Sequence, residues 1–132
     1  MSKELPQKYE LLSGANLAYI GDAYYELKVR EHLINKGITK ANDLRKISIK
    51  YVSATAHQKI YEEIKDLLTE EENKVFLRGR NNAPTGHRKN VDRAAYLTST
   101  GLEAVIGYLY LSGNNERLDY LINLIFSKVD GE

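Results

Sequence analysis

Two short segments of the sequence each place one carboxylate close to a glycine, and together they form a candidate metal site. Asp22 directly follows Gly21, and Glu103 lies four residues before Gly107. A glycine inside a helix costs about 1 kcal/mol relative to alanine, so each of these glycines indicates a close approach of two backbones. Two such helices can cross and bring Asp22 and Glu103 together. Two carboxylates suit a hard cation such as Mg²⁺, which also keeps waters and phosphate oxygens in its shell.

The same acids also have a plainer interpretation. Glu26 lies one helical turn after Asp22, so these two carboxylates can face one solvent pocket. They can equally be surface residues that pair with Arg30 or Lys28. Glu103 can be an ordinary acid on a helix face, beside a glycine that only allows tight packing. The sequence separation between the two segments does not decide between these alternatives.

A third segment, at about residues 78–93, is strongly basic. Residues 78–90 hold four Arg or Lys and one His without an acid, and Asp92 and Arg93 extend this to five basic residues against one acid. The segment therefore carries +4 in a chain whose net charge is +1. Such a loop can neutralise phosphates, and its amide and hydroxyl side chains can reach 2′-hydroxyls or base edges. The alternative is a solvated loop, and the GK[ST] ending of a P-loop is absent.

Length and composition limit what the elements around these residues can be. A chain of 132 residues with 42% hydrophobic and 28% charged residues is expected to form one folded domain over 1–132. The absence of cysteine excludes disulfides, thiolate metal sites and thiol nucleophiles, and suits a cytoplasmic location. We expect no signal peptide and no membrane association, because no apolar run is long enough. His32, His57 and His87 are too dispersed for a zinc motif and are expected on helix faces or in loops.

The spacing of apolar residues predicts an all-α protein. Only Pro6 and Pro84 interrupt the chain, and a parallel sheet has no place between them. A first long helix is expected from Ala15 to Lys36, with Gly37 as its left-handed C-cap. Its expected apolar stripe consists of Leu17, Ile20, Ala23, Tyr24, Leu27, Leu33 and Ile34.

Shorter helices are expected to follow it. Thr39 is expected to cap a short second helix, and a third is expected at about 50–68. Thr69 and Glu72 fit a capping box, which predicts a fourth helix that ends at about Arg78. After the polar stretch that follows, apolar periodicity resumes, and Gly113 ends the fifth helix. Asn114 is expected to cap the last one, whose apolar residues are Leu118, Leu121, Ile122 and Ile125.

Four motifs in this order resemble mini-ribonuclease III, the short branch of the ribonuclease III family that consists of the catalytic domain without a double-stranded-RNA-binding domain. They are LAYIGDA at 17–23, YVSA at 51–54, RGRN at 78–81, and ST at 99–100 with EA and IGY at 103–108. The similarity extends from about Leu11 to Ile125. It implies the all-α ribonuclease III endonuclease fold, a homodimer, and a groove for double-stranded RNA.

The resemblance also assigns roles to particular residues. Asp22 and Glu103 match the metal-site acids of the family and are the expected catalytic and metal-binding residues, with Mg²⁺ as the cofactor and Mn²⁺ as a substitute. Larger relatives have three further carboxylates, where this chain has Ala15, Ala18 and Thr100. Water must then fill more of the coordination shell. The expected RNA-binding residues are Arg78, Arg80, Asn81, Asn82, Thr85, His87, Arg88 and Lys89.

The implied activity is metal-assisted hydrolysis of double-stranded RNA that leaves 5′-phosphate and 3′-hydroxyl ends. The implied cellular task is maturation of precursor large-subunit (23S) ribosomal RNA, with a ribosomal protein as a further expected partner. Two alternatives stay open at the level of sequence. One is a non-catalytic helical RNA-binding or ribosome-assembly factor, which the missing carboxylates favour. The other is a helical dimer that binds proteins through its ten tyrosines.

Overall fold

The structure, a computed structural model, describes residues 8–83 and 92–131, and every regular element in these ranges is a helix. The predicted all-α fold is therefore confirmed. Thr85, His87, Arg88 and Lys89 lie outside the described residues. In chain order the elements are η1 (Tyr9–Leu11), α1 (Gly14–Asn35), α2 (Ala41–Val52), α3 (Ala54–Ile64), η2 (Lys65–Leu67), α4 (Glu70–Asn81), α5 (Arg93–Leu111) and α6 (Asn115–Asp130).

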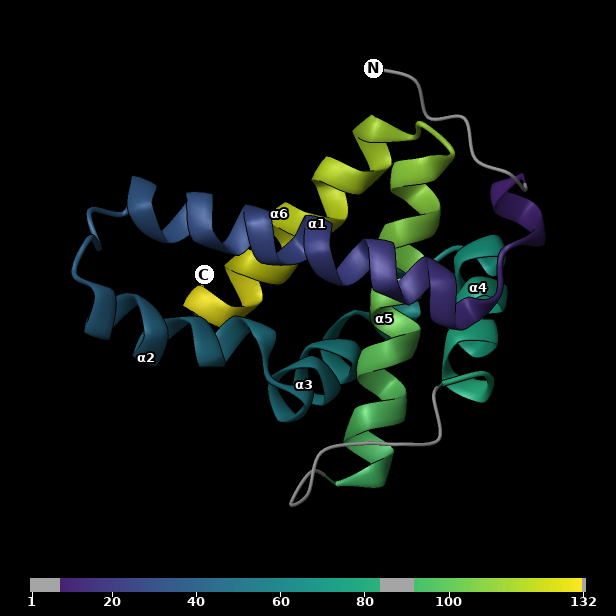
Figure 1. The fold of residues 1–132 in the computed structure, drawn as a ribbon, viewed down its shortest axis with the longest axis horizontal. Coiled ribbons are helices and arrows are strands. Elements are labelled where there is room, and N and C mark those ends of the chain that lie inside the picture. Colours follow the sequence, from purple (N-terminus) through teal and green to yellow (C-terminus); the bar gives the residue numbers. More distant parts are fainter. Residues whose placement is uncertain (1–7, 84–91, 132) are drawn as a thin grey trace.

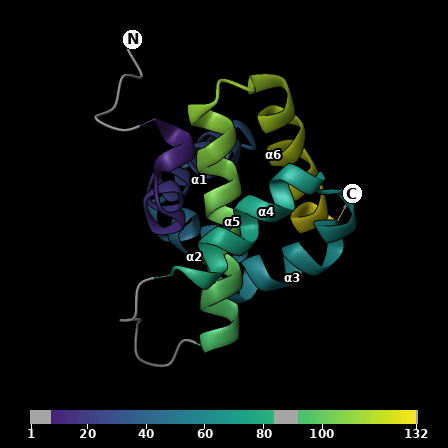
Figure 2. The same ribbon diagram turned by 90° about the vertical axis from the view of Figure 1, so that its right-hand side faces the viewer.

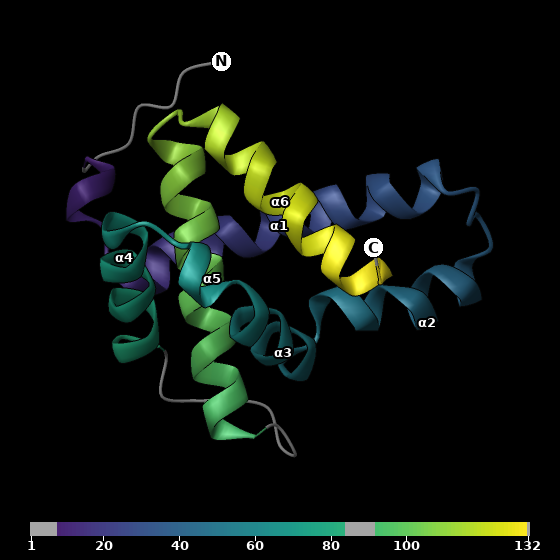
Figure 3. The ribbon, with the colours of Figure 1, turned by 180° about the vertical axis from the view of Figure 1, so that it is seen from behind.

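Helix α5 is the centre of the fold. It packs against α1, α3, α4 and α6, and α1 crosses it steeply (Figure 1). Turned by a right angle, α5 lies between α1 on one side and α3, α4 and α6 on the other (Figure 2). Seen from behind, α6 descends from the end of α5 towards α2 (Figure 3). Both long helices that carry the candidate acids therefore meet in the middle of the molecule.

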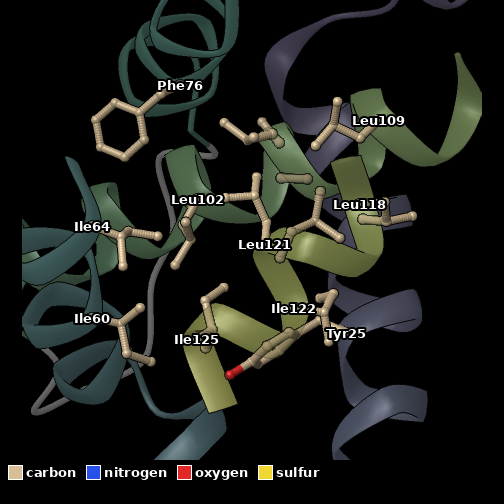
Figure 4. Close-up of a cluster of buried hydrophobic side chains, with 14 of the residues drawn as sticks. Tyr25, Ile60, Ile64, Phe76, Leu102, Leu109, Leu118, Leu121, Ile122 and Ile125 are labelled. Carbon is tan, nitrogen blue, oxygen red and sulfur yellow. The ribbon is translucent and has the colours of Figure 1, made fainter. Parts of the chain in front are cut away.

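The hydrophobic core fills the space around α5. Figure 4 shows Tyr25 of α1 beside leucines and isoleucines of α6, with Ile60 and Ile64 of α3 and Phe76 of α4 on the far side of Leu102. Full burial of each such side chain contributes roughly 1.5–3 kcal/mol of transfer free energy. The core therefore holds α1, α3, α4 and α6 against the same central helix.

Helix α1 buries a face that differs from the predicted stripe. Leu17 and Leu33 are buried as expected, but so is Tyr25, whereas Leu27 and Ile34 are 53% and 54% exposed. The prediction was wrong for Leu27 and Ile34, and for Ala23, which is also exposed, because α1 has apolar residues on both of its faces. Periodicity alone does not show which of the two faces meets α5.

Two glycines decide that orientation, because they allow α1 and α5 to touch. A Cβ at Gly21 would overlap the backbone carbonyl oxygen of Glu103, and a Cβ at Gly107 would overlap that of Leu17. Any other residue at either position would force the helices apart. The predicted glycine crossing is thus confirmed, and it places Asp22 next to the backbone of Glu103.

The helix ends follow the predicted signals in most places. Thr69 and Glu72 form the complete capping box of α4, with bonds of 2.9 and 3.1 Å. Asn114 caps α6, and Gly37 and Gly113 have φ values of 88° and 77°. Each of these ends depends on a few adjacent residues, which is why the sequence could predict it.

Three boundaries differ from the prediction. Thr39 does not cap α2, which begins at Ala41 after Lys40, without a side-chain cap bond. The helix expected at 50–68 is broken at Ser53, where extended backbone separates α2 from α3 and the Ser53 hydroxyl accepts from the Ala56 amide. Helix α4 continues past Arg78 to Asn81.

Among the described residues no helix is long and apolar enough to cross a membrane.

Candidate active site at the crossing of α1 and α5

A pocket of about 590 Å³ opens where α1 crosses α5, and both predicted acids line it. Helix α1 contributes Asp22 and Glu26, which are one turn apart. The break between α2 and α3 contributes residues 49 and 52–55. Helix α5 and its N-cap contribute Asp92, Tyr96, Ser99 and Glu103. The crossing therefore gathers polar side chains from three separate parts of the chain.

Residues 92, 96, 99 and 103 lie on one face of α5, at steps of four, three and four. Of these four residues, Glu103 alone has a role that the sequence predicts. The helical spacing back from Glu103 could have identified Ser99 and Tyr96, but it does not by itself show which face of α5 is open. That is decided by the packing of α1 and α3.

Asp22 and Glu103 form an electrostatically coupled pair. Burial raises the pKa of Glu103 to about 9, and the charge of Asp22 together with a hydrogen bond to it acts in the same direction. The more distant charge of Glu26 adds to this effect. A pair of this kind holds a proton at neutral pH, and a cation that neutralises both carboxylates displaces that proton into the solvent.

The donor set fits a hard divalent cation with few protein ligands. Asp22 and Glu103 supply two carboxylates, but no group of three or more His, Cys, Asp or Glu in the described residues is placed to hold a metal. Glu26 instead accepts a hydrogen bond of 3.2 Å from Arg30, as the plainer interpretation expected for that acid. Water and RNA phosphate oxygens would have to supply the remaining ligands of Mg²⁺.

The positions that lack a family carboxylate add no ligand to this pocket. Ala18 is buried in the core. The Thr100 hydroxyl donates to the Tyr96 carbonyl of its own helix at 3.0 Å. The pocket therefore gains no carboxylate from these positions.

The predicted RNA-binding residues at the end of α4 fall into two groups. Some bond to the protein's own backbone, and the others are exposed. The Arg78 guanidinium donates to the backbone carbonyls of Leu12 and Glu10, so it ties α4 to the segment before α1. Arg80 and Asn81 are exposed at the end of α4, and Asn82 donates to the Arg78 carbonyl at 2.8 Å. Among the predicted RNA-binding residues that the structure describes, Arg80 and Asn81 are therefore the two that are exposed and make no hydrogen bond to a backbone carbonyl.

His57 lies on a face of α3, one of the two positions that the sequence predicts for it, but this face is turned into the protein. Its side chain is buried, and its Nδ1 lies 2.6 Å from Ser99 Oγ. Burial lowers the pKa of His57 to about 4, although the Tyr51 carbonyl and the charge of Asp22 partly oppose this. His57 is therefore neutral at physiological pH and touches a residue of the pocket.

Comparison with known proteins places these features in context. The ribonuclease III domain family matches residues 15–114. The chain is 43% identical to the mini-ribonuclease 3 of Streptococcus pneumoniae, over 92% of this chain and 96% of the relative. It is 47% identical to that of Symbiobacterium thermophilum, over 80% and 82%. A crystal structure of a Fusobacterium nucleatum protein, 29% identical, superposes with a TM-score of 0.81 over 92% of this chain and 98% of the other.

Proposed function

The chain belongs to the ribonuclease III family, and on that premise we propose that the pocket at the α1–α5 crossing cleaves double-stranded RNA with Asp22 and Glu103 as its catalytic acids. The chain is an endoribonuclease, as its family and relatives indicate. The observation that carries the proposal for the site is the coupled carboxylate pair at the glycine crossing.

The two acids of the pocket have a simple task in this mechanism. Asp22 and Glu103 would hold one Mg²⁺, with Mn²⁺ as a substitute, and Glu103 must lose its proton for this. When bound, the cation polarises the scissile phosphate and acidifies water for in-line attack. The water oxygen loses a proton and bonds to phosphorus, the bond to the 3′ oxygen breaks, and that oxygen takes up a proton. The products carry a 5′-phosphate and a 3′-hydroxyl.

Lysine side chains beside the catalytic pocket form a surface that can bind the RNA duplex. Ile49, Ser53 and Thr55 line both the catalytic pocket and a second pocket of about 360 Å³. The charged residues that line that neighbouring pocket are Glu63 and three lysines, Lys50, Lys59 and Lys128, and we call it the lysine groove. No ion pair of these lysines occurs among the described residues. Each lysine is exposed and can neutralise one phosphate of the duplex.

The outer face of α1 supports the proposed homodimer. Tyr19, Leu27 and Ile34 are 78%, 53% and 54% exposed and lie on one side of the helix, opposite its buried face. They are spaced about two helical turns apart along this side, and we assign this surface to the contact with the second subunit. A Leu27→Asp variant is expected to sediment as a monomer at concentrations where the wild type is a dimer, and an unchanged sedimentation coefficient would refute this contact.

For the natural substrate we propose precursor 23S ribosomal RNA in the cytoplasm, with a ribosomal protein as a further partner. A-form RNA is recognised chiefly through its shape, phosphates and 2′-hydroxyls. The choice of one site in a precursor therefore requires help from the fold of the RNA or from a bound protein.

Cleavage of a labelled RNA duplex tests the assignment of the site. Asp22→Asn and Glu103→Gln are each expected to reduce Mg²⁺-dependent cleavage by about 100-fold or more, because each removes half of the protein's ligands. Asp66→Asn, which changes an exposed acid outside the pocket, serves as the matched control and retains wild-type cleavage. Cleavage by both site variants at the wild-type rate would refute the assignment.

The same experiment examines the alternative of a non-catalytic RNA-binding factor. The small set of acidic ligands is the observation that favours that alternative. It predicts salt-sensitive binding of the duplex by the wild type without any cleavage, in Mg²⁺ or in Mn²⁺.

A further inference from the structure

A buried histidine, His57, contacts a residue that lines the catalytic pocket. His57 lies on α3, its side chain is 1% exposed, and its Nδ1 is 2.6 Å from the hydroxyl oxygen of Ser99. Ser99 in turn lines the pocket one helical turn before Glu103. This hydrogen bond therefore joins α3 to the face of α5 on which the reaction takes place.

The bond keeps the Ser99 hydroxyl away from the usual partner of a helical serine. A Ser or Thr inside a helix commonly donates to a carbonyl of the preceding turn. The hydroxyls of Thr100, Ser112 and Ser127 all do so, at 2.8–3.1 Å. The partner of Ser99 in the described residues is His57 instead. Whichever tautomer the histidine adopts, it occupies one hydrogen-bonding position of Ser99 Oγ and leaves the others for the pocket.

Core packing alone does not account for a histidine at this place. His57 Nε2 is buried and makes no hydrogen bond of ordinary geometry among the described residues, although the Tyr51 carbonyl is near enough to act on the pKa of His57. An unsatisfied buried nitrogen is unfavourable, and an apolar side chain of similar size would avoid that cost. The polar contact that His57 does make is directed at the one serine that α5 presents to the pocket.

We propose that Ser99 Oγ forms a hydrogen bond with the sugar–phosphate backbone of RNA in the pocket, and that His57 is a positioning residue that holds Ser99 in the required orientation. This inference rests on the proposed function of the pocket. The RNA atom that Ser99 contacts is either a phosphate oxygen or a ribose 2′-hydroxyl. A serine hydroxyl can bind both, because it donates one hydrogen bond and accepts others.

The variants Ser99→Ala, His57→Leu and His57→Gln test the inference in Mg²⁺-dependent cleavage of a defined RNA duplex. Loss of one hydrogen bond to a charged or polar backbone group is expected to lower kcat/KM of Ser99→Ala by about 10-fold. His57→Leu should show a similar loss, because its Ser99 hydroxyl is free to turn to its own helix. His57→Gln should recover most of that loss, since an amide can still bind Ser99. Ser127→Ala, whose hydroxyl bonds only its own helix, is the control.

A double-variant comparison separates positioning from a structural role. In a Ser99→Ala background, His57→Leu and His57→Gln should cleave equally fast, because no hydroxyl remains to be oriented. A difference that persists in that background would show that His57 acts on folding, and would overturn the inference. Urea denaturation of each variant ensures that rates are compared among folded proteins.

A duplex with a single 2′-deoxyribose next to the cleaved bond identifies the atom that Ser99 contacts. If the wild type is slowed by this change and Ser99→Ala is not slowed further, Ser99 binds the 2′-hydroxyl. If Ser99→Ala is slowed by the same factor on both duplexes, Ser99 binds a phosphate oxygen. Wild-type rates for Ser99→Ala on both duplexes would overturn the inference. A wild type that does not cleave RNA would instead refute the proposed function.

Discussion

Replacement of Glu103 by glutamine tests the coupled carboxylate pair through stability rather than activity. In the absence of a divalent cation, burial and Asp22 hold the pKa of Glu103 at about 9, well above its ordinary value of 4.5. Between these two values the folded protein binds one proton more than the unfolded chain. The free energy of unfolding must then decrease as the pH rises, by up to about 1.4 kcal/mol per pH unit.

The pH window for this measurement follows from a second buried group. Burial lowers the pKa of His57 to about 4, so His57 makes the protein more stable as the pH rises from about 4 to 6.5. Above pH 6.5 the stability that His57 contributes no longer changes with pH. Of these two groups, only Glu103 then makes the free energy of unfolding depend on pH. From pH 6.5 to 8.5 the wild type should lose up to about 3 kcal/mol of stability in chelator.

Urea denaturation followed by circular dichroism measures this slope. Glu103→Gln should have a flatter pH dependence and, at pH 8.5 in chelator, should be more stable than the wild type, because folding of the wild type at this pH requires Glu103 to keep a proton that the unfolded chain has lost, whereas glutamine is neutral in both states. Mg²⁺ should stabilise the wild type more than the variant. Glu31→Gln, which changes an exposed acid that pairs with Lys28, is the control and keeps the wild-type slope. A Glu103→Gln protein with the wild-type slope, or with lower stability at pH 8.5, would refute the coupling of the two acids.

Three further variants examine the scaffold and the RNA surface. Gly21→Ala should abolish cleavage and lower the free energy of unfolding by about 1–3 kcal/mol, because its Cβ overlaps the Glu103 backbone; wild-type urea denaturation and cleavage would contradict the crossing. Arg117→Met should cost about 2 kcal/mol, since it leaves the buried Glu72 carboxylate without its 2.8 Å partner; calorimetry should show a lower melting temperature, with cleavage by the folded variant retained. Replacement of all three lysines of the lysine groove by glutamine should reduce the slope of log K for RNA binding against log salt by about 3, whereas Lys74→Gln on α4 should change it little; equal slopes would exclude the groove from the RNA contact.

The sequence by itself determined the helices and most of their ends. The capping box at Thr69, the cap at Asn114 and the left-handed glycines at 37 and 113 each depend on residues within a few positions of one another. The glycines beside Asp22 and Glu103 also marked the crossing correctly, because a glycine in a helix has an energetic cost that close packing can offset. The two candidate acids could therefore be identified from the residues adjacent to them in the chain.

Tertiary structure alone decided which faces of these helices are buried and what surrounds the acids. Leu27 and Tyr25 are equally good core residues by type, and only the contact with α5 buries one and exposes the other. His57 and Ser99 are far apart in the chain, so no local pattern indicates their hydrogen bond. Helix caps are local interactions, and apolar periodicity is a local pattern. Both can therefore be identified from residues that are close together in the chain. Burial, raised pKa values and pocket walls arise from groups that become neighbours only when the chain packs.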